Sequence, residues 1–431
     1  MGVARAATWL PEPGPPLRLL LGAFGDPGHA FPVIALGREL VRRGHEVTLE
    51  TWKRWEDAAT AEGMAFAPAP EYHVFPTRER PLKPYEVVVR AAGVSRELVR
   101  SVAPDAVVAD ILTLAPALGA ELEGVPVATL VPHVHPGTPP GWAPYSMGAR
   151  LPRSPFGRGL WRMTDPIVGR GLEQGRVELN ETRRRLGLPP LAHVHGGLSH
   201  QLCMVATFPQ LEYPRAWEPW EHVVGPLFWE QPYADVEPPP GDAPLVLVAP
   251  STSQDPDGRL LRATLEGLAG EDVRVLASTN RRPPASPLAV ASNARLVDWV
   301  SYERTMPRCD VVVCHGGHGT VARALASGCV VVVVPAAGDM NENAARVDWA
   351  GVGVRLPRRL ATARAVRLAV RAALADPRLR ARARELAAWS AAHDGAARAA
   401  GLVERFAQRT RRSRAAALAV PTLPAESRTT A

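Results

Sequence analysis

Short apolar runs alternate with longer amphipathic segments in two separate stretches of the chain. In the first stretch, the apolar run 17–24 precedes an amphipathic segment at 30–44, and the alternation continues to the run 125–131. The rhythm restarts at 244–250 and continues to 352–356. Such alternation is typical of βα units, in which helices cover both faces of a parallel sheet. The pattern predicts an α/β fold with two parallel sheets, one in each half of the chain.

The two halves meet at a segment rich in proline and acidic residues. This segment, 226–243, interrupts both the helical and the strand pattern, so we interpret it as an interdomain linker beside a cleft. The predicted organisation is a domain at 16–225, the linker, a domain at 244–408 that ends in helices, and a disordered tail at 409–431. Residues 136–200, rich in Pro, Gly, Trp and Arg, are expected to form loops and irregular helices along one wall of the cleft.

The composition is that of a globular protein that needs no disulfides. Of 431 residues, 46% are apolar and 22% are charged. The four cysteines show neither a CxxC pair nor a zinc-binding spacing, so we expect them to be reduced and structural. The longest apolar runs, such as 329–337, are far shorter than the ~20 residues of a membrane helix, and the first fifteen residues lack the apolar stretch of a secretory signal. We expect a cytoplasmic protein without membrane insertion.

The net charge of +7 comes almost entirely from arginine, because Lys53 and Lys83 are the only lysines. A nucleic-acid-binding protein is expected to show an arginine stripe interleaved with aromatic residues. Here the arginines cluster at 358–382 and 405–414, within or just after alanine-rich helical patterns. We interpret them as solvated helix faces and a basic tail, and we expect no nucleic-acid partner.

A glycine-rich turn lies between an apolar run and an amphipathic segment of the second half. Its sequence, His-Gly-Gly-His-Gly-Thr at 315–320, would expose backbone N–H groups at the positive end of a helix, where a diphosphate can be held. The glycines would let phosphates approach the backbone, and the side chains of His315 and Thr320 add donors. A tight connection alone would need only glycine, so the turn predicts a binding site. It is not a Walker loop, because no Gly-Lys-Ser/Thr follows.

A histidine follows the first predicted strand. His29 lies in the loop 26–32, at the carboxyl end of the first sheet, which faces the crevice of an α/β fold. Asp110 ends a later strand at the same edge, and a carboxylate commonly orients a histidine that acts near pH 7. Other interpretations remain open, since His29 could be a solvated loop residue and Asp110 could cap the following helix.

The turn at 315–320, together with Gly-Asp at 338–339 and Asn-Glu-Asn-Ala-Ala-Arg-Val at 341–347, resembles the donor-binding signature of family 1 glycosyltransferases. This family belongs to the UDP-glycosyltransferase superfamily and includes bacterial natural-product enzymes. The resemblance covers nearly the whole chain. It implies the GT-B fold, two Rossmann-like domains facing a central cleft, and transfer of a sugar from a nucleotide-sugar donor, without a cofactor, to a small-molecule acceptor.

The resemblance also implies roles for individual residues. Trp299 would stack on the donor base, and Asp339 would bind sugar hydroxyls. Without the resemblance, Trp299 could equally be a core aromatic residue. The donor site as a whole would comprise Trp299, His315, Gly316, Gly317, Gly319, Thr320, Asp339 and Ser253. His29 would be the general base of an inverting in-line displacement, with Asp110 as its partner.

The acceptor side is less defined by the sequence. His133 and His135 follow a predicted strand, and either could line the acceptor pocket or be a loop residue. The irregular region 139–170 suggests an apolar aromatic or polyketide-like acceptor through Trp142, Tyr145, Met147 and Trp161, but these residues could equally pack the domain.

Two positions depart from the family pattern. Arg323 stands where many enzymes with uridine donors carry a glutamate for the ribose hydroxyls, and Met340 stands where they carry a glutamine. Both changes remove groups that read hydroxyls. We therefore hypothesise a dTDP-deoxysugar donor, with a UDP-hexose as the alternative.

Three further alternatives concern metal binding and catalysis. Asp255-Pro256-Asp257 has the D-x-D form of a metal site, but Asp257 more naturally caps the next helix. The glycine turn already supplies the positive potential that a metal would, so we predict that the enzyme needs no metal. A non-catalytic auxiliary protein of the same fold is a rival that Arg323 and Met340 favour. A nucleotide-sugar epimerase of this fold is a weaker rival.

Overall fold

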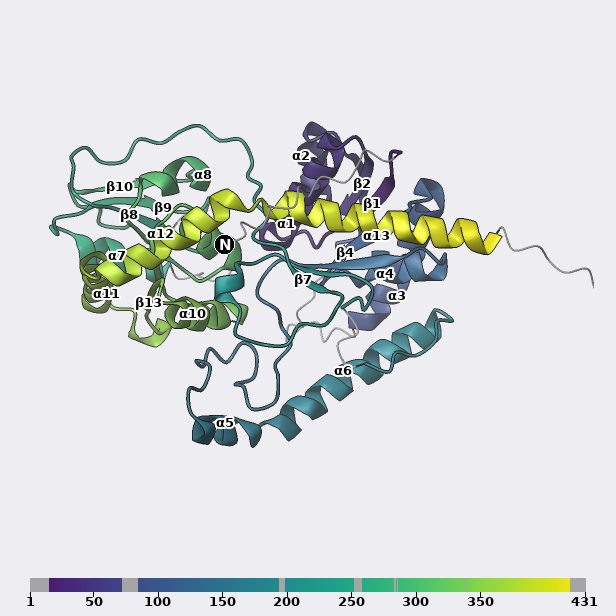
Figure 1. Ribbon diagram of the computed structural model, residues 1–431. Coiled ribbons are helices and arrows are strands. Elements are labelled where there is room, and N and C mark those ends of the chain that lie inside the picture. Colours follow the sequence, from purple (N-terminus) through teal and green to yellow (C-terminus); the bar gives the residue numbers. More distant parts are fainter. Residues whose placement is uncertain are drawn as a thin grey trace, which may run out of the picture.

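Two parallel sheets organise the molecule (Figure 1). The computed structural model describes residues 15–71, 84–193, 198–251, 258–282, 284, 286–336 and 338–418. The first sheet has the order β3 (Ala65–Pro68), β2 (Glu46–Thr51), β1 (Arg18–Gly22), β4 (Ala106–Asp110), β5 (Val127–Val131), β6 (Cys203–Val205) and β7 (Glu221–Val223). The second has the order β10 (Ala294–Val297), β9 (Arg274–Ser278), β8 (Leu245–Ala249), β11 (Val311–Cys314), β12 (Val330–Val333) and β13 (Gly353–Arg355). All described strand pairs are parallel, which confirms the predicted α/β class.

Helices connect and cover the strands. Those before the linker are α1 (Pro27–Arg42), α2 (Glu56–Ala61), α3 (Pro84–Val102), α4 (Leu114–Leu122), α5 (Pro155–Arg162) and α6 (Asp165–Arg185). Those after it are α7 (Arg259–Leu268), α8 (Tyr302–Thr305), α9 (His318–Ala326), α10 (Asp339–Ala350), α11 (Ala363–Ala375), α12 (Pro377–Ala392) and α13 (Gly395–Leu418). Short 3-10 turns occupy Lys53–Trp55, Pro209–Leu211, Met306–Arg308 and Arg358–Leu360. Every residue of β11 and β12 is buried, as expected for parallel strands covered on both faces.

The strand register brings the loops of interest together at two sheet edges. Gly22 at the end of β1 lies opposite Ala109 of β4, so the segments that follow these strands begin side by side. In the second sheet, Cys314 at the end of β11 lies opposite Ala249 at the end of β8. Residues 226–243, between the two sheets, form no helix or strand.

The last helix differs from the predicted organisation. A domain ending at 408 and a disordered tail from 409 were expected, but α13 continues to Leu418 and returns across the first domain, where it lies along α1 (Figure 1). The physical reason is that Ala399, Val403 and Phe406 recur at helical spacing and are buried in the core of the first sheet. Residues 419–431 lie outside the described part of the chain.

The segment 136–200 is also more regular than expected. It contains α5 and the 21-residue helix α6, which lie apart from the sheets (Figure 1). Large apolar side chains such as Phe156 and Met163 are 83% and 74% exposed there. Pro155 and Pro166 lie in the first turns of α5 and α6, where a missing N–H is tolerated, and so do not interrupt these helices.

Candidate active site

His29 and Asp110 form a hydrogen-bonded pair at the edge of the first sheet. His29 lies in the first turn of α1, and Asp110 is the last residue of β4. His29 Nδ1 is 2.8 Å from Asp110 Oδ1, and the exposed fractions of the two side chains are 17% and 0%. Because Asp110 accepts a hydrogen bond from Nδ1–H, Nε2 is the basic nitrogen of the neutral ring.

The remaining contacts of Asp110 decide between the two interpretations of this residue. Its second oxygen accepts hydrogen bonds from the Phe24 amide and the Thr113 hydroxyl, each at 3.3 Å. Helix α4 begins at Leu114 with Thr113 as its N-cap. Asp110 therefore orients His29 and does not cap the helix.

The electrostatic surroundings of His29 come from both halves of the chain. Burial lowers its pKa, but the charge and hydrogen bond of Asp110 outweigh burial, and the net pKa is raised above 6.5. Asp339, the first residue of α10, adds to this increase. The charge of Asp339, from the second domain, thus acts on His29, from the first.

His133 belongs to the same group, whereas His135 does not. The His133 ring centroid is 6.0 Å from that of His29, and burial followed by the charge of His29 lowers its pKa, so it is held neutral. Tyr145 places its hydroxyl 3.3 Å from His133 Nδ1, a contact that the sequence pattern did not identify. His135 Nε2 instead pairs with Glu221 at 3.0 Å.

Trp142, the other predicted acceptor residue, packs against a residue outside the group of His29, Asp110 and His133. Its ring lies edge-on to Tyr213, with centroids 5.3 Å apart. The cavity beside it has a volume of about 10 Å³, close to the space of one water molecule. In this conformation Trp142 packs the loop that faces α10, and its contact with an acceptor remains a prediction.

The glycine turn between β11 and α9 has two kinds of glycine. Gly316 has a φ of +89°, and a Cβ there would lie 2.9 Å from Val333 Cγ1 and 3.0 Å from the Met340 carbonyl oxygen. A Cβ on Gly317 would lie 2.4 Å from His315 Nε2. A Cβ on Gly319 would meet no atom within 4 Å. The turn itself requires the first glycine, the second leaves room for the His315 ring, and the third leaves the first turn of α9 open to a ligand.

The two histidines of this turn have different surroundings. His315 places Nδ1 3.2 Å from the Ala249 carbonyl oxygen at the end of β8. His318 is buried against Asn343, and burial followed by the charge of His133 lowers its pKa to about 4. Asn343 also donates to the Gly316 carbonyl at 2.9 Å and so holds the turn against α10. His315 is therefore the candidate for binding, while His318 and Asn343 are structural.

Trp299 is half-buried after β10, and an unexpected residue covers it. The guanidinium carbon of Arg281 lies 4.9 Å from the ring centroids of both Trp299 and Tyr233. Asn280 and Arg281 have φ values of 52° and 61°, so the arginine lies in a turn made of two consecutive left-handed residues. Nothing in the sequence pattern marks these conformations, which depend on the surrounding structure.

Thr320 hydrogen-bonds the buried Tyr302 phenol. The same phenol accepts from Asn280 Nδ2 at 3.4 Å, and Asn280 also donates to the Pro250 carbonyl at the end of β8. The Thr320 hydroxyl is thus part of a network that joins three loops of the second sheet. Ser253 and the motif 255–257 lie outside the described residues.

Arg323 is turned toward the linker. Its guanidinium carbon lies 4.2 Å from the Phe228 ring centroid, and Glu303 and Glu230 contribute charge beside it while burial lowers its pKa. Met340 places its carbonyl against the glycine turn. Neither residue offers a carboxylate or amide to a ligand.

The described residues include all four cysteines. Cys203, Cys309, Cys314 and Cys329 are buried and unbridged. Within the described ranges, no three His, Cys, Asp or Glu side chains are grouped as metal ligands. No described helix is both long and apolar enough to cross a membrane.

Several known proteins are similar to this chain. Residues 262–404 match the family model of the erythromycin biosynthesis protein CIII-like C-terminal domain. The chain is 30% identical to 4'-demethylrebeccamycin synthase of Lentzea aerocolonigenes, over 90% of this chain and 99% of that protein. It is 27% identical to O-mycaminosyltylonolide 6-deoxyallosyltransferase of Streptomyces fradiae, over 91% and 98%.

Solved structures share its fold. The glycotransferase of kitacinnamycin aligns with a TM-score of 0.73 at 23% identity, over 91% of this chain and 99% of that one. The glycosyltransferase VinC, solved in complex with DTDP, aligns with a TM-score of 0.67 at 19% identity, over 91% and 100%.

Proposed function

Because this chain belongs to the family 1 glycosyltransferases of the bacterial natural-product type, with the GT-B fold, we propose that it is an inverting enzyme. It transfers a hexose or deoxyhexose from a nucleotide-diphosphate sugar to a small natural-product acceptor. The observation that carries this proposal is the His29–Asp110 pair, which faces Asp339 of the other domain.

The proposed reaction is one in-line displacement. His29 Nε2 accepts the proton of the acceptor nucleophile while that atom attacks the anomeric carbon. The bond between this carbon and the diphosphate oxygen breaks on the opposite face, which gives inversion. The N–H groups at the start of α9, together with His315, stabilise the charge that develops on the leaving diphosphate. Asp339 holds sugar hydroxyls between the two domains.

A dTDP-deoxysugar is the donor that we favour, with a UDP-hexose as the alternative. Arg323 packs on Phe228 and supplies no carboxylate for the two hydroxyls of a uridine ribose. A 2'-deoxyribose has only one such hydroxyl to satisfy. The similarity to VinC, which was solved with DTDP, supports this choice.

The proposal is tested by His29→Ala. Loss of the general base should reduce kcat/KM for glycosyl transfer by about 10²–10⁴-fold, whereas dTDP affinity should change little because the diphosphate site lies on the other sheet. The measurement is product formation by chromatography alongside calorimetric dTDP binding. Undiminished transfer would contradict the assignment. A wild-type protein that binds dTDP but transfers to no acceptor would favour the non-catalytic alternative.

We also propose that the reaction needs no metal, since the start of α9 supplies positive potential where the diphosphate would lie. Transfer should continue unchanged in excess EDTA. Activity that is lost in EDTA and restored by Mg²⁺ would show that a metal replaces or supplements this role.

A further inference from the structure

Helix α5 and the start of α6 carry a row of exposed apolar side chains, which we call the α5 stripe. Its members Phe156, Leu160, Met163 and Ile167 are 83%, 56%, 74% and 70% exposed. They recur at intervals of four, three and four residues, the spacing of one face of a helix. The residues between the two helices also have helical backbone angles, so the spacing continues from one helix to the next. An exposed apolar row of this length marks a surface that another body covers.

The other face of α5 is cationic and lies toward the rest of the molecule. Arg158 and Arg162 are each two positions from Leu160, which places them about 160° around the helix from it. A Cβ added to Gly141 would lie 3.2 Å from the Arg158 carbonyl oxygen and 3.2 Å from Arg162 Cγ, so α5 packs on the preceding loop through its arginine side. The α5 stripe is therefore turned away from that loop, on a helix that stands apart from both sheets (Figure 1).

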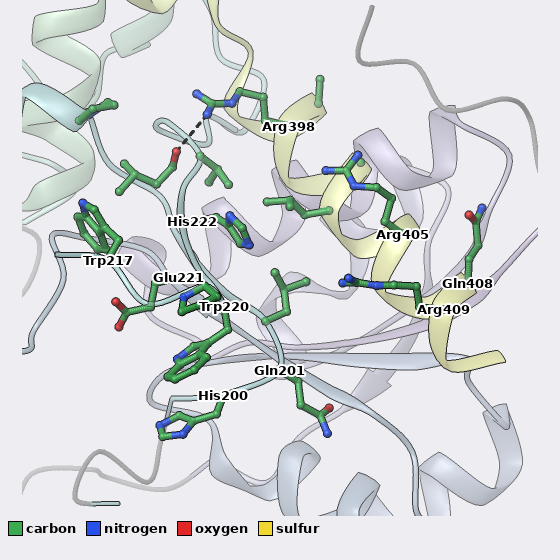
Figure 2. Close-up of a pocket in the computed structure, with 18 of the residues that line it drawn as sticks. His200, Gln201, Trp217, Trp220, Glu221, His222, Arg398, Arg405, Gln408 and Arg409 are labelled. Atoms are coloured by element: carbon green, nitrogen blue, oxygen red, sulfur yellow. Dashed lines mark hydrogen bonds between the residues drawn. The ribbon is translucent and has the colours of Figure 1, made fainter. Parts of the chain in front are cut away.

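The arginines beside α5 gather around a hollow of about 370 Å³. It is lined by Arg153, Arg158 and Arg162 together with a proline, and no acid is among the lining residues. Asp165, the nearest acid in sequence, accepts a hydrogen bond from a loop amide. Arg398 of α13 has different surroundings, since it lines a cavity of about 1000 Å³ between α13 and β7 and donates to a backbone carbonyl there (Figure 2). The hollow beside α5 thus presents positive charge to an anion.

Helix α5 is formed without help from a partner. The Ser154 hydroxyl caps it by accepting a hydrogen bond from the Gly157 amide at 3.1 Å, and Pro155 occupies its first turn. The apolar and the cationic faces are therefore already separated on the two sides of the helix. A short helix with this division, apolar on one face and rich in arginine on the other, is typical of helices that lie in the surface of a bilayer.

The charge of this segment favours an anionic bilayer over a second copy of the chain. Residues 150–170 include five arginines and one acid, hence a net charge of +4. A two-fold contact places the same patch of both copies together, so it would bring two such segments into repulsion. A bilayer with anionic lipid instead offers an apolar interior to the α5 stripe and phosphates to the arginines.

We propose that α5 and the start of α6 dock on the surface of a bilayer that contains anionic phospholipid. The α5 stripe enters the boundary between headgroups and acyl chains, and the guanidinium groups of Arg153, Arg158 and Arg162 bind lipid phosphates on the other side of the helix. The helix lies in the surface and does not cross the bilayer, because its eight residues are far fewer than the ~20 that a span requires. This docking does not depend on the proposed sugar transfer.

The test is co-sedimentation of the full chain with vesicles. One set contains equal parts of phosphatidylglycerol and phosphatidylcholine, and the other contains phosphatidylcholine alone. The wild type should bind the anionic vesicles about tenfold or more tightly, and this preference should shrink as salt is added. Phe156→Ser/Met163→Ser should weaken binding to the anionic vesicles by about tenfold or more, because two large apolar side chains no longer enter the bilayer. Leu360→Ser/Leu368→Ser, at positions of the second domain that are 52% and 53% exposed, should stay within about twofold of the wild type.

The contribution of charge has its own variant. Arg153→Gln/Arg158→Gln/Arg162→Gln should weaken binding to the anionic vesicles by about tenfold or more and reduce its salt dependence. The matched control, which removes three charges from exposed positions of α11 and α12, should stay within about threefold of the wild type. This control is Arg364→Gln/Arg378→Gln/Arg384→Gln.

Each remaining outcome counts against the proposal. Circular dichroism checks the fold of the variants, and the comparison of the two vesicle types with the wild type needs no variant. Absence of binding to the anionic vesicles, or equal binding to both types, would overturn the proposal. So would unchanged binding in a folded Phe156→Ser/Met163→Ser variant. Self-association of the wild type that this variant loses, measured by analytical ultracentrifugation without vesicle binding, would show that a second copy covers the α5 stripe instead.

Discussion

At the scale of single residues, the candidate site consists of side chains that are far apart in the sequence but in contact in the fold. His29 and Asp110 are 81 positions apart, yet they were predicted together because both follow strands that end at one sheet edge. The contact of Tyr145 with His133 and the position of Arg281 over Trp299 were not predicted. Their positions depend on a loop that folds back onto His133 and on a left-handed turn after β9, and neither geometry has a signature in the local sequence.

The charge of Asp110 should set the pH dependence of transfer. The base acts when His29 is neutral, so kcat/KM should rise as the pH increases through the raised pKa of His29. In Asp110→Asn the charge that raises this pKa is gone while burial, which lowers it, remains. The acid limb should therefore shift to lower pH, and the plateau should fall by at least about tenfold because orientation is weakened. The measurement is a pH–rate profile.

Thr113→Val is the matched control for this experiment. It removes a hydrogen bond to the second oxygen of Asp110 but leaves the His29 contact intact. Its acid limb should stay within a few tenths of a pH unit of the wild type. An unchanged acid limb in Asp110→Asn would show that Asp110 does not control the protonation of His29.

At the scale of elements, the strand–turn–helix unit of β11 and α9 shows how far sequence reasoning reaches. Apolar runs bounded by glycines were sufficient to predict the strand, the turn and the helix, because parallel strands buried on both faces have near-continuous apolar sequences. The clamp on this turn could not be predicted in the same way. Asn343, 27 residues after Gly316, reaches the turn only because α10 packs beside it.

The glycines of this turn should respond differently to substitution. Gly316→Ala puts a Cβ at a φ of +89° and near Val333 and the Met340 carbonyl, so it should reduce the free energy of unfolding by more than about 1 kcal/mol. Gly319→Ala meets no protein atom, so it should leave stability within about 0.5 kcal/mol but weaken dTDP binding. Denaturant unfolding and calorimetry measure the two effects. The interpretation fails if Gly319→Ala binds dTDP as tightly as the wild type.

At the scale of the whole molecule, the two α/β halves were predictable from the repeated alternation of apolar and amphipathic segments. The path of α13 was not. A helical pattern indicates which residues share a face but not which domain that face will meet, and Val403 and Phe406 pack into the first domain although they follow the second in sequence. This return places the arginines of α13 beside β7 and creates the cavity there.

Glycosyl transfer by the proposed mechanism requires a nucleotide site on the second sheet that faces the His29–Asp110 pair on the first. Its most direct test is calorimetric titration of the purified protein with dTDP and with UDP. We predict that both nucleotides bind at a site weakened by Gly319→Ala, with dTDP the tighter. Failure of the wild-type protein to bind either nucleotide would contradict the account.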